Sequence, residues 1–185
     1  MKTLCPILLL ILSLTLLSSS CKKHVIKPID QLPPATQTGA NTFGCLVNGA
    51  AFLPAGGDFS GPIKQCNYIY TSGGFSFDVG ASNKNTPAQV KGIVIGTDSL
   101  AIAEGKTFTF STRVAGNAYA MYTIYYNSGD INRYSTTNLV SGTLTITKMD
   151  TLKQFVSGTF WFNAINSNGD TVKVTDGRFD MLYTR

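Results

Sequence analysis

The feature that most constrains the fold is a succession of short runs of β-branched and aromatic residues, which fills most of the chain after residue 42. The runs span residues 68–70, 75–79, 90–95, 107–110, 118–127, 141–149, 154–165 and 171–183. Clusters of Gly, Asn, Asp and Pro separate them, as turns separate strands. We therefore predict one all-β domain at residues 42–185, an antiparallel β-sandwich or flattened barrel of eight or more strands.

The run at 171–183 contains Asp176-Gly177, which has two interpretations. Asp-Gly usually forms a two-residue hairpin turn, but it also suits a bulge in one long strand. Folding the chain back about the turn at 166–170 places Thr159 near Gly177, and this pairing favours the bulge. Only residues 98–105 could form a turn of helix.

The N-terminal residues have the three parts of an export signal. Lys2 precedes an apolar stretch at 4–17, and three serines follow. A bilayer-spanning helix needs roughly 20 apolar residues, so this stretch is too short for a lasting anchor. We predict a cleaved signal peptide at residues 1–20.

Cys21 follows the serines directly, and this arrangement resembles the lipobox of bacterial lipoproteins. The lipobox pattern prefers leucine three residues before the cysteine, where this chain has Ser18 and carries Leu17 one place earlier. The resemblance implies that Cys21 becomes the first residue and carries the lipid, which would hold the protein on a membrane. A secreted protein with a free Cys21 is the alternative.

Residues 21–41 contain three prolines and few large apolar side chains. We expect them to form a lipidated, flexible tether. Lys22 follows Cys21, in place of the aspartate that resembles an inner-membrane retention signal. The expected location is therefore the cell envelope, at the outer membrane and facing the periplasm.

The chain has a formal charge of +5, but the excess of basic residues lies near the N-terminus. After residue 44, eleven Lys and Arg residues face nine Asp and Glu residues. Because phosphate-binding surfaces need clustered positive charge, we expect no nucleic-acid partner. The expected partner is the membrane, through the lipid on Cys21, and a protein or small ligand of unknown identity.

The residue types of the domain argue against an enzyme. The only histidine of the chain, His24, lies in the expected tether, so the domain has no imidazole for a catalytic triad or a metal site. Asp176 and Asp180 could approach the spacing of a glycosidase pair, but they flank Asp-Gly and we expect structural or solvated roles. We predict no catalytic residues, no cofactor and no metal; an enzyme using Asp, Lys, Tyr or Ser ranks third.

Four tyrosines in the run at 118–127 are the candidate ligand-facing residues: Tyr119, Tyr122, Tyr125 and Tyr126. Strand alternation puts two of them on each face, so part of this strand is expected to be exposed or to line a cleft. Trp161 lies in the nearby meander. A platform for sugars or an apolar ligand is one interpretation, and core aromatics are the other.

Two further sets of residues are candidate modification sites. Cys45 and Cys66 are expected to pair if their strands are neighbours, although two separate buried thiols remain the alternative. Three Asp-Ser/Thr-apolar triplets resemble the acceptors of an O-glycosylation system of Gram-negative envelopes, with acceptors at Ser99, Thr151 and Thr171. Asp-Ser and Asp-Thr also favour plain turns.

The two ends of the domain carry distinctive motifs. Residues 38–54 read "TGANTFGCLVNGAAFLP", and residues 158–183 read "GTFWFNAINSNGDTVKVTDGRFDMLY". They are similar to the TGxxTFGCLVNG opening and the GTFxF…DGRFD ending of a family of small, uncharacterised Gram-negative bacterial lipoproteins. The resemblance implies a β-rich envelope lipoprotein and assigns no activity.

These expectations lead to two functional hypotheses. The first is a membrane-anchored envelope lipoprotein that acts as a non-enzymatic binding or structural module. The second is a lipocalin-like carrier of a small apolar ligand, which requires a closed apolar cavity of several hundred cubic ångströms.

Overall fold

The computed structural model describes residues 26–56, 62–71 and 73–185. In this part of the chain a 3-10 helix, η1 (Pro28–Gln31), precedes the strands. The strands are β1 (Thr42–Val47), β2 (Ala50–Phe52), β3 (Lys64–Thr71), β4 (Gly74–Thr86), β5 (Gln89–Thr97), β6 (Thr107–Thr109), β7 (Ala118–Tyr126), β8 (Ile131–Ser135), β9 (Gly142–Asp150), β10 (Phe155–Ile165) and β11 (Thr171–Leu182).

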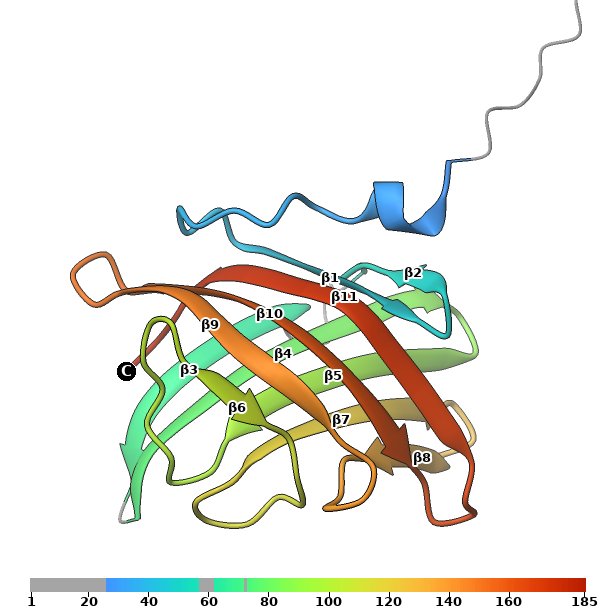
Figure 1. Ribbon diagram of the computed structural model, residues 1–185. Helices are drawn as coiled ribbons and strands as arrows, with labels where there is room; N and C mark the ends of the chain where they lie inside the picture. Colours follow the sequence, from blue (N-terminus) through green and yellow to red (C-terminus); the bar gives the residue numbers. More distant parts are fainter. Residues whose placement is uncertain (1–25, 57–61, 72) are drawn as a thin grey trace, which may run out of the picture.

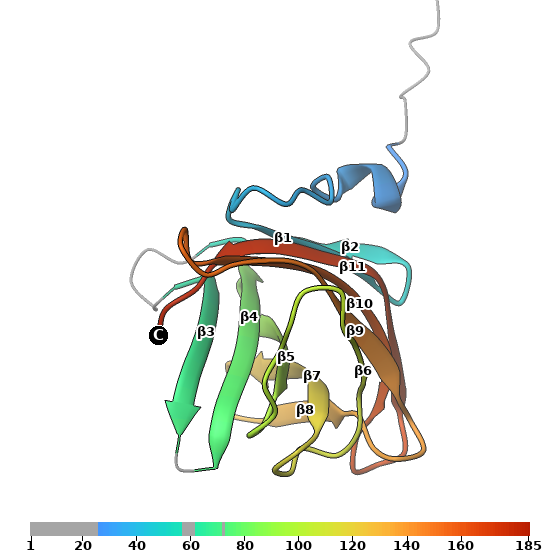
Figure 2. The ribbon, with the colours of Figure 1, turned by 60° about the vertical axis from the view of Figure 1, so that its left-hand side comes forward.

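All these strands belong to one sheet, in the order β2-β1-β11-β10-β8-β7-β5-β4-β3, with β9 on β10 and β6 on β9. Figures 1 and 2 show that the sheet folds into two facing layers. One edge is joined where Ile165 of β10 pairs with Ser135 of β8. At the other edge, β3 is connected to the segment that follows β11, because Tyr68 N of β3 donates to the Thr184 carbonyl at 2.8 Å. The fold is a flattened antiparallel barrel, which confirms the predicted all-β class.

The expected strand positions are found, with two additions and one correction. Three strands lie outside the eight runs: β1, which contains Cys45, and the short strands β2 and β8, which were not expected. Strands β3 and β4 are longer than the runs that indicated them. Residues 98–105, where a helical turn was considered, contain only a hydrogen-bonded turn, with Lys106 N donating to Ala103 O at 3.2 Å.

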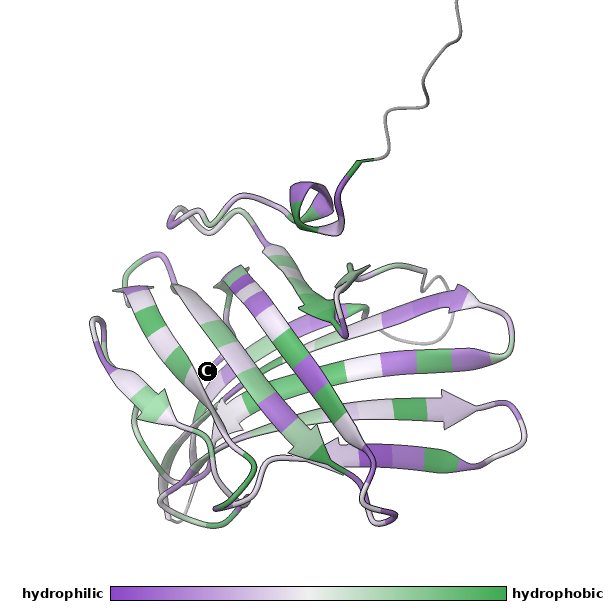
Figure 3. Cartoon of the chain, turned by 45° about the vertical axis from the view of Figure 1, so that its right-hand side comes forward, coloured by the Kyte–Doolittle hydropathy of each residue, from purple (hydrophilic) through white to green (hydrophobic). Residues whose placement is uncertain are grey.

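The core fills the space between the two layers with side chains from alternate strand positions. Successive side chains of a strand point to opposite faces, and Figure 3 shows the resulting bands of apolar and polar residues. Phe77, Phe110 and Phe162 are almost completely buried, and Phe162 meets Phe110 edge to face with ring centroids 6.0 Å apart. Aromatic side chains therefore occupy the centre of the barrel.

Strand β11 bends at a bulge around Asp176. The register against β10 changes from Phe160↔Gly177 to Phe162↔Val174, so β11 contains one extra residue. Asp176 takes that bend with φ of 54°, a region that Asp tolerates better than most residues. The strand continues through Asp176-Gly177, which confirms the bulge interpretation.

The segment before β1 lies on the outer side of the layer that contains β1 and β11 (Figure 1). Leu32 is buried, and Pro33 covers Gly44, where a Cβ would come within 2.7 Å of the Pro33 Cδ. The expected tether thus includes a stretch that is bound to the domain, because Asp180 of β11 binds the backbone of residues 38–40. The predicted signal peptide, Cys21 and His24 lie outside the described residues.

Gly177 allows the barrel to close over Phe160. A Cβ at position 177 would lie 2.5 Å from carbon atoms of the buried Phe160 ring. We expect Gly177→Ala to lower the free energy of unfolding by about 1–3 kcal/mol, because the core has no room for the added carbon. Urea unfolding followed by circular dichroism measures the change.

Gly92→Ala is the matched control for this substitution. Gly92 also lies in a strand, but the nearest atom to its Cβ position is 3.9 Å away. The control should unfold close to the wild-type midpoint. Equal losses in the two variants would contradict the role assigned to the contact between Gly177 and Phe160.

Candidate functional site

A pocket of about 400 Å³ opens on the outer face of β9, β10 and β11. We call it the Trp161 pocket; its lining residues are Ala35, Thr143, Thr159, Phe160, Trp161, Asp176, Gly177 and Arg178. Trp161 is 45% exposed. It points outward because Phe160 and Phe162, its neighbours along β10, both point into the core. The strand that builds the core thereby presents an indole to solvent.

Threonines extend this surface across β9 and β6. The register pairs Thr159 of β10 with Thr145 of β9, and Thr145 with Thr107 of β6. A second row pairs Trp161 with Thr143, and Thr143 with Thr109. Neighbouring strands lie about 4.8 Å apart, so these residues form two parallel rows. We call the set the Thr–Trp face: Thr107, Thr109, Thr143, Thr145, Thr159, Trp161, Asp176 and Arg178.

Two charged groups stand at the end of these rows. Arg178 pairs with Thr159 across the strands and donates from Nε to the Asp176 backbone carbonyl at 3.1 Å. Within the described part of the chain, the terminal nitrogens of Arg178 and the Asp176 carboxylate have no hydrogen-bond partner. The pocket thus combines an aromatic plane, hydroxyl groups, a guanidinium and a carboxylate, a set suited to binding a polar ligand.

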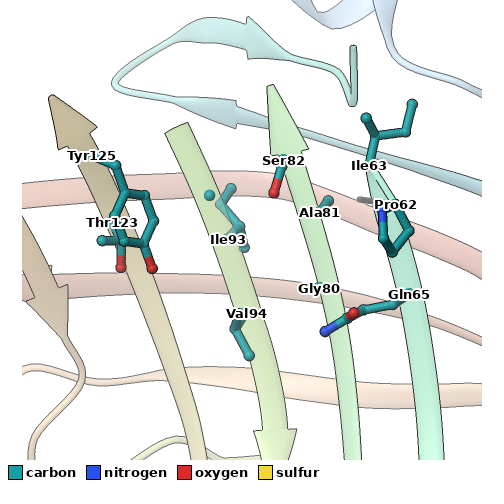
Figure 4. A pocket seen from close by; sticks show the side chains of 11 residues that line it. Pro62, Ile63, Gln65, Gly80, Ala81, Ser82, Ile93, Val94, Thr123 and Tyr125 are labelled. Atoms are coloured by element: carbon teal, nitrogen blue, oxygen red, sulfur yellow. The ribbon is translucent and has the colours of Figure 1, made fainter. Parts of the chain in front are cut away.

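A second pocket, of about 140 Å³, lies on the other layer (Figure 4). Its lining residues include Gly80, Gly92, Gln65, Ser82 and Tyr125. The Gln65 side chain lies close over Gly80, with its Cγ 3.3 Å from the Cβ position of that glycine. Among the described residues, no charged side chain lines this pocket, so the described lining offers fewer directional contacts than that of the Trp161 pocket.

The four tyrosines predicted to face a ligand are distributed among three environments. Tyr122 is buried in the core beside Tyr134, and burial, followed by the neighbouring Tyr134, raises its pKa to about 12. Tyr119 is buried under Arg113, whose guanidinium lies 4.6 Å from the ring centroid. Tyr125 and Tyr126 are exposed. These residues do not form a single platform, although Tyr125 lines the second pocket.

Asp78 belongs to a polar cluster that fixes the C-terminus to β3. Asn67 Nδ2 donates to Asp78 at 2.9 Å, and Thr184 Oγ1 donates to Asn67 at 2.7 Å. Burial raises the pKa of the Asp78 carboxyl, while Asn67 and Arg113 lower it in part. The cluster closes the edge of the barrel and has a structural role.

Cys45 and Cys66 do not form the predicted disulfide. Both are free, buried thiols. Their strands are not neighbours, since β1 pairs with β2 and β11 while β3 pairs with β4. Burial raises the pKa of both thiols, and the Asp78 carboxylate adds to the effect at Cys66. The two cysteines are separate, buried thiols that pack as small hydrophobic side chains, which is the alternative considered for them.

The three predicted acceptors for O-glycosylation lie in or beside loops, as expected. Thr151 is exposed in the turn between β9 and β10, and Thr171 is exposed at the start of β11. Ser99 is half-buried, and its hydroxyl donates to Asp98 at 3.3 Å. Their modification stays a prediction.

Asp180 is the most extensively hydrogen-bonded carboxylate of the described residues, and it is 0% exposed. Thr36 Oγ1 donates to it at 2.6 Å, and Ser157 Oγ donates at 2.8 Å. The backbone N–H groups of Thr38, Gly39 and Ala40 donate at 2.8–3.0 Å. Burial acts to raise the pKa of Asp180, but these donors outweigh it and hold the pKa far below its usual range. The carboxylate is a structural clamp for the N-terminal segment.

This clamp also places the edge of the Trp161 pocket. Ala35, which immediately precedes the clamped residues, is one of the lining residues. Sequence reasoning missed both the clamp and the pocket. The available signals were the Thr-x-Thr patterns at 107–109 and 143–145 and the alternation of 159–162, with Thr159 and Trp161 on one side and two phenylalanines on the other.

No helix of residues 26–56, 62–71 or 73–185 is long and apolar enough to span a membrane. In the same part of the chain, no group of three or more His, Cys, Asp or Glu side chains is arranged to bind a metal ion.

The Asp180 clamp predicts a specific pH dependence of stability. Since the pKa of Asp180 is lower in the folded chain than in the unfolded chain, where it is about 3.9, the ionised carboxylate stabilises the fold above pH 4. This stabilisation decreases as the pH falls below about 4. We expect Asp180→Asn to lower the free energy of unfolding at pH 7 by roughly 2–4 kcal/mol, with a smaller loss at pH 2.5.

Thr36→Val and Thr38→Val form a matched pair for this prediction. Thr36 donates to the carboxylate at 2.6 Å, whereas the Thr38 hydroxyl lies 3.4 Å away. We expect Thr36→Val to cost more stability, and to expose residues 26–40 to protease faster. A pH profile of Asp180→Asn parallel to that of the wild type would contradict the clamp.

Comparison with known proteins gives a family but no activity. No curated protein and no solved structure matches the chain. Residues 89–182, from β5 to the end of β11, match the profile of a family described as a domain of unknown function (DUF6252). This match spans half of the chain and includes Trp161, Asp176, Arg178 and Asp180, and the chain therefore belongs to the DUF6252 family.

Proposed function

We propose that this protein is a lipid-anchored, non-enzymatic binding module of the cell envelope. The anchor is the lipid on Cys21, and the binding surface is the Thr–Trp face of the barrel. The proposed location is the outer membrane, with the domain facing the periplasm.

The half-exposed Trp161 is the observation that carries the binding role. Tryptophan is highly buried on average. Here Trp161 is exposed in a pocket of about 400 Å³, beside the Asp176 carboxylate and the terminal nitrogens of Arg178, which have no hydrogen-bond partner among the described residues. Aromatic and arginine side chains contribute much of the affinity at recognition surfaces. A purely structural sheet surface has no need of this combination.

The packed barrel supports binding on the outside rather than a lipocalin-like carrier. A carrier needs a closed apolar cavity of several hundred cubic ångströms. Phe77, Phe110 and Phe162 occupy the space between the layers, whereas the Trp161 pocket opens on the outer face.

The N-terminal segment supports the anchored arrangement. Residues 36–40 are fixed by Asp180 on the outer side of β11, and the chain continues from there to the proposed lipid site. The domain therefore has a fixed attachment point on one edge of the layer that carries the Thr–Trp face.

Cys21→Ser tests the anchor. We expect the wild-type protein in the membrane fraction, with an intact mass that exceeds residues 21–185 by the mass of a diacylglycerol and an acyl chain. The variant should keep its signal peptide uncleaved or appear in the soluble fraction, and it should lack the lipid mass. Fractionation and intact-mass spectrometry measure both.

Cys66→Ala is the control, because it removes a buried thiol and leaves Cys21 in place. It should remain lipidated. A native wild-type protein whose mass equals the bare polypeptide would contradict the anchor, and removal of the domain from intact cells by protease would contradict the periplasmic orientation.

A further inference from the structure

We propose that the Thr–Trp face is a binding site for a neutral oligosaccharide, with one pyranose ring stacked on Trp161. This inference rests on the proposed binding function and adds the chemical class of the ligand. It follows from the combination of an aromatic plane, rows of hydroxyls and balanced charge in one open pocket.

The stacking element is the indole. A pyranose ring presents axial C–H groups on one face and hydroxyls around its edge, so it needs an apolar plane with polar groups around it. Trp161 supplies the plane at 45% exposure. Thr143 lies directly across from it on β9, and Thr159 lies two residues before it on the same face of β10, so hydroxyls flank the indole on two sides.

The polar groups around the indole are free to bind. In the part of the chain described, no hydrogen bond involves the side chains of Thr143 and Thr159, and the terminal nitrogens of Arg178 and the Asp176 carboxylate also lack partners. Arg178 is held in place by its Nε bond to the Asp176 carbonyl, at 3.1 Å. A guanidinium donates to sugar hydroxyls and a carboxylate accepts from them.

The bulge in β11 supplies the carboxylate. A β-bulge re-aims a side chain relative to a regular strand. Asp176 has φ of 54° in the middle of β11, and it lines the pocket. Asp176 and Arg178 are two residues apart and lie on the same side of β11, and both line the pocket.

Charge and shape select a neutral, extended ligand. Asp176 and Arg178 are the only charged residues among the described residues that line the pocket. Their charges balance, so neither a polyanion nor a polycation is favoured. The rows of threonines continue from the pocket across β9 and β6. A chain of several sugar rings fits this surface better than a single ring.

Fluorescence of the wild-type protein gives a direct readout, because Trp161 is the only tryptophan of the chain. The full chain is purified from membranes in a detergent without a sugar headgroup, and it is titrated with cellohexaose and with chitohexaose. We expect one of these neutral chains to shift the Trp161 emission saturably and to reduce its quenching by acrylamide. Sorbitol, which has hydroxyls but no ring, should do neither.

Variants separate this site from the rest of the surface. Calorimetry with the oligosaccharide that binds should show affinity reduced about tenfold in Arg178→Ala and in Asp176→Asn, where Asn tolerates the positive φ of this residue as Asp does, and lost in Trp161→Ala. Tyr125→Ala is the matched control, because Tyr125 is an aromatic residue of similar exposure, 44%, on the other layer. Its affinity should equal that of the wild type, and all four variants should unfold near the wild-type midpoint because these side chains point outward.

Three results would overturn the inference. The first is no change in Trp161 emission or quenching with either oligosaccharide. The second is an emission change that follows protein concentration alone, which would make the face a contact between two copies of the chain. The third is sugar binding that survives Trp161→Ala, which would keep a binding function but remove it from this pocket. Failure of the membrane anchor is read separately, from the mass and fractionation of the Cys21 variant.

Discussion

The alternation of side chains along β10 is the constraint on which both the core and the candidate site depend. Phe160 and Phe162 fill the barrel, so Thr159 and Trp161 must face outward. A shift of one residue would exchange the two sets, placing the indole in the core and two phenylalanines in water. Pairing of β10 with β9 on one side and β11 on the other fixes this register over most of the strand.

The outer surface of this layer is divided between the N-terminal segment and the open face. Pro33 covers Gly44 of β1, and Asp180 holds residues 36–40 over the end of β11. Ala35 lies at the border of the Trp161 pocket, which opens on the uncovered outer face of β9, β10 and β11. An ionised carboxylate therefore sets where the covered part of the sheet ends. Burial of Asp180 is tolerated because five groups donate to it at 2.6–3.0 Å, as a buried charge requires.

Local patterns were sufficient to predict the class of fold and the position of most strands. Runs such as 90–95 and 118–127 have the alternation and β-branched content that strands need, and their turns contain Gly, Asn and Asp. Patterns within one segment do not specify partners that lie far away in the chain. The predicted Cys45–Cys66 pair failed for this reason, since it depended on β1 and β3 being neighbours. The hydrogen bond between Thr36 and Asp180 could not be predicted for the same reason, because the two residues are 144 positions apart in the sequence.

The site was only partly visible for the same physical reason. Four tyrosines in one run were the obvious aromatic signal, but their environments depend on the neighbouring elements: Tyr119 is covered by Arg113, and Tyr122 lies against Tyr134. Trp161 was visible as a residue, whereas its exposure follows from its two flanking phenylalanines.

The bulge at Asp176 links the packing of the core to the geometry of the pocket. Gly177 lies against the Phe160 ring, where no Cβ fits, so this residue must face the core as a glycine. The extra residue that precedes it leaves the regular ladder and turns outward, with φ of 54° at Asp176. Arg178, the next residue on the outer side, is then fixed by its bond to the Asp176 carbonyl. The extra residue in β11 thus keeps Val174 and Gly177 both on the inner side of the barrel, while Asp176 and Arg178 line the pocket on the outer side.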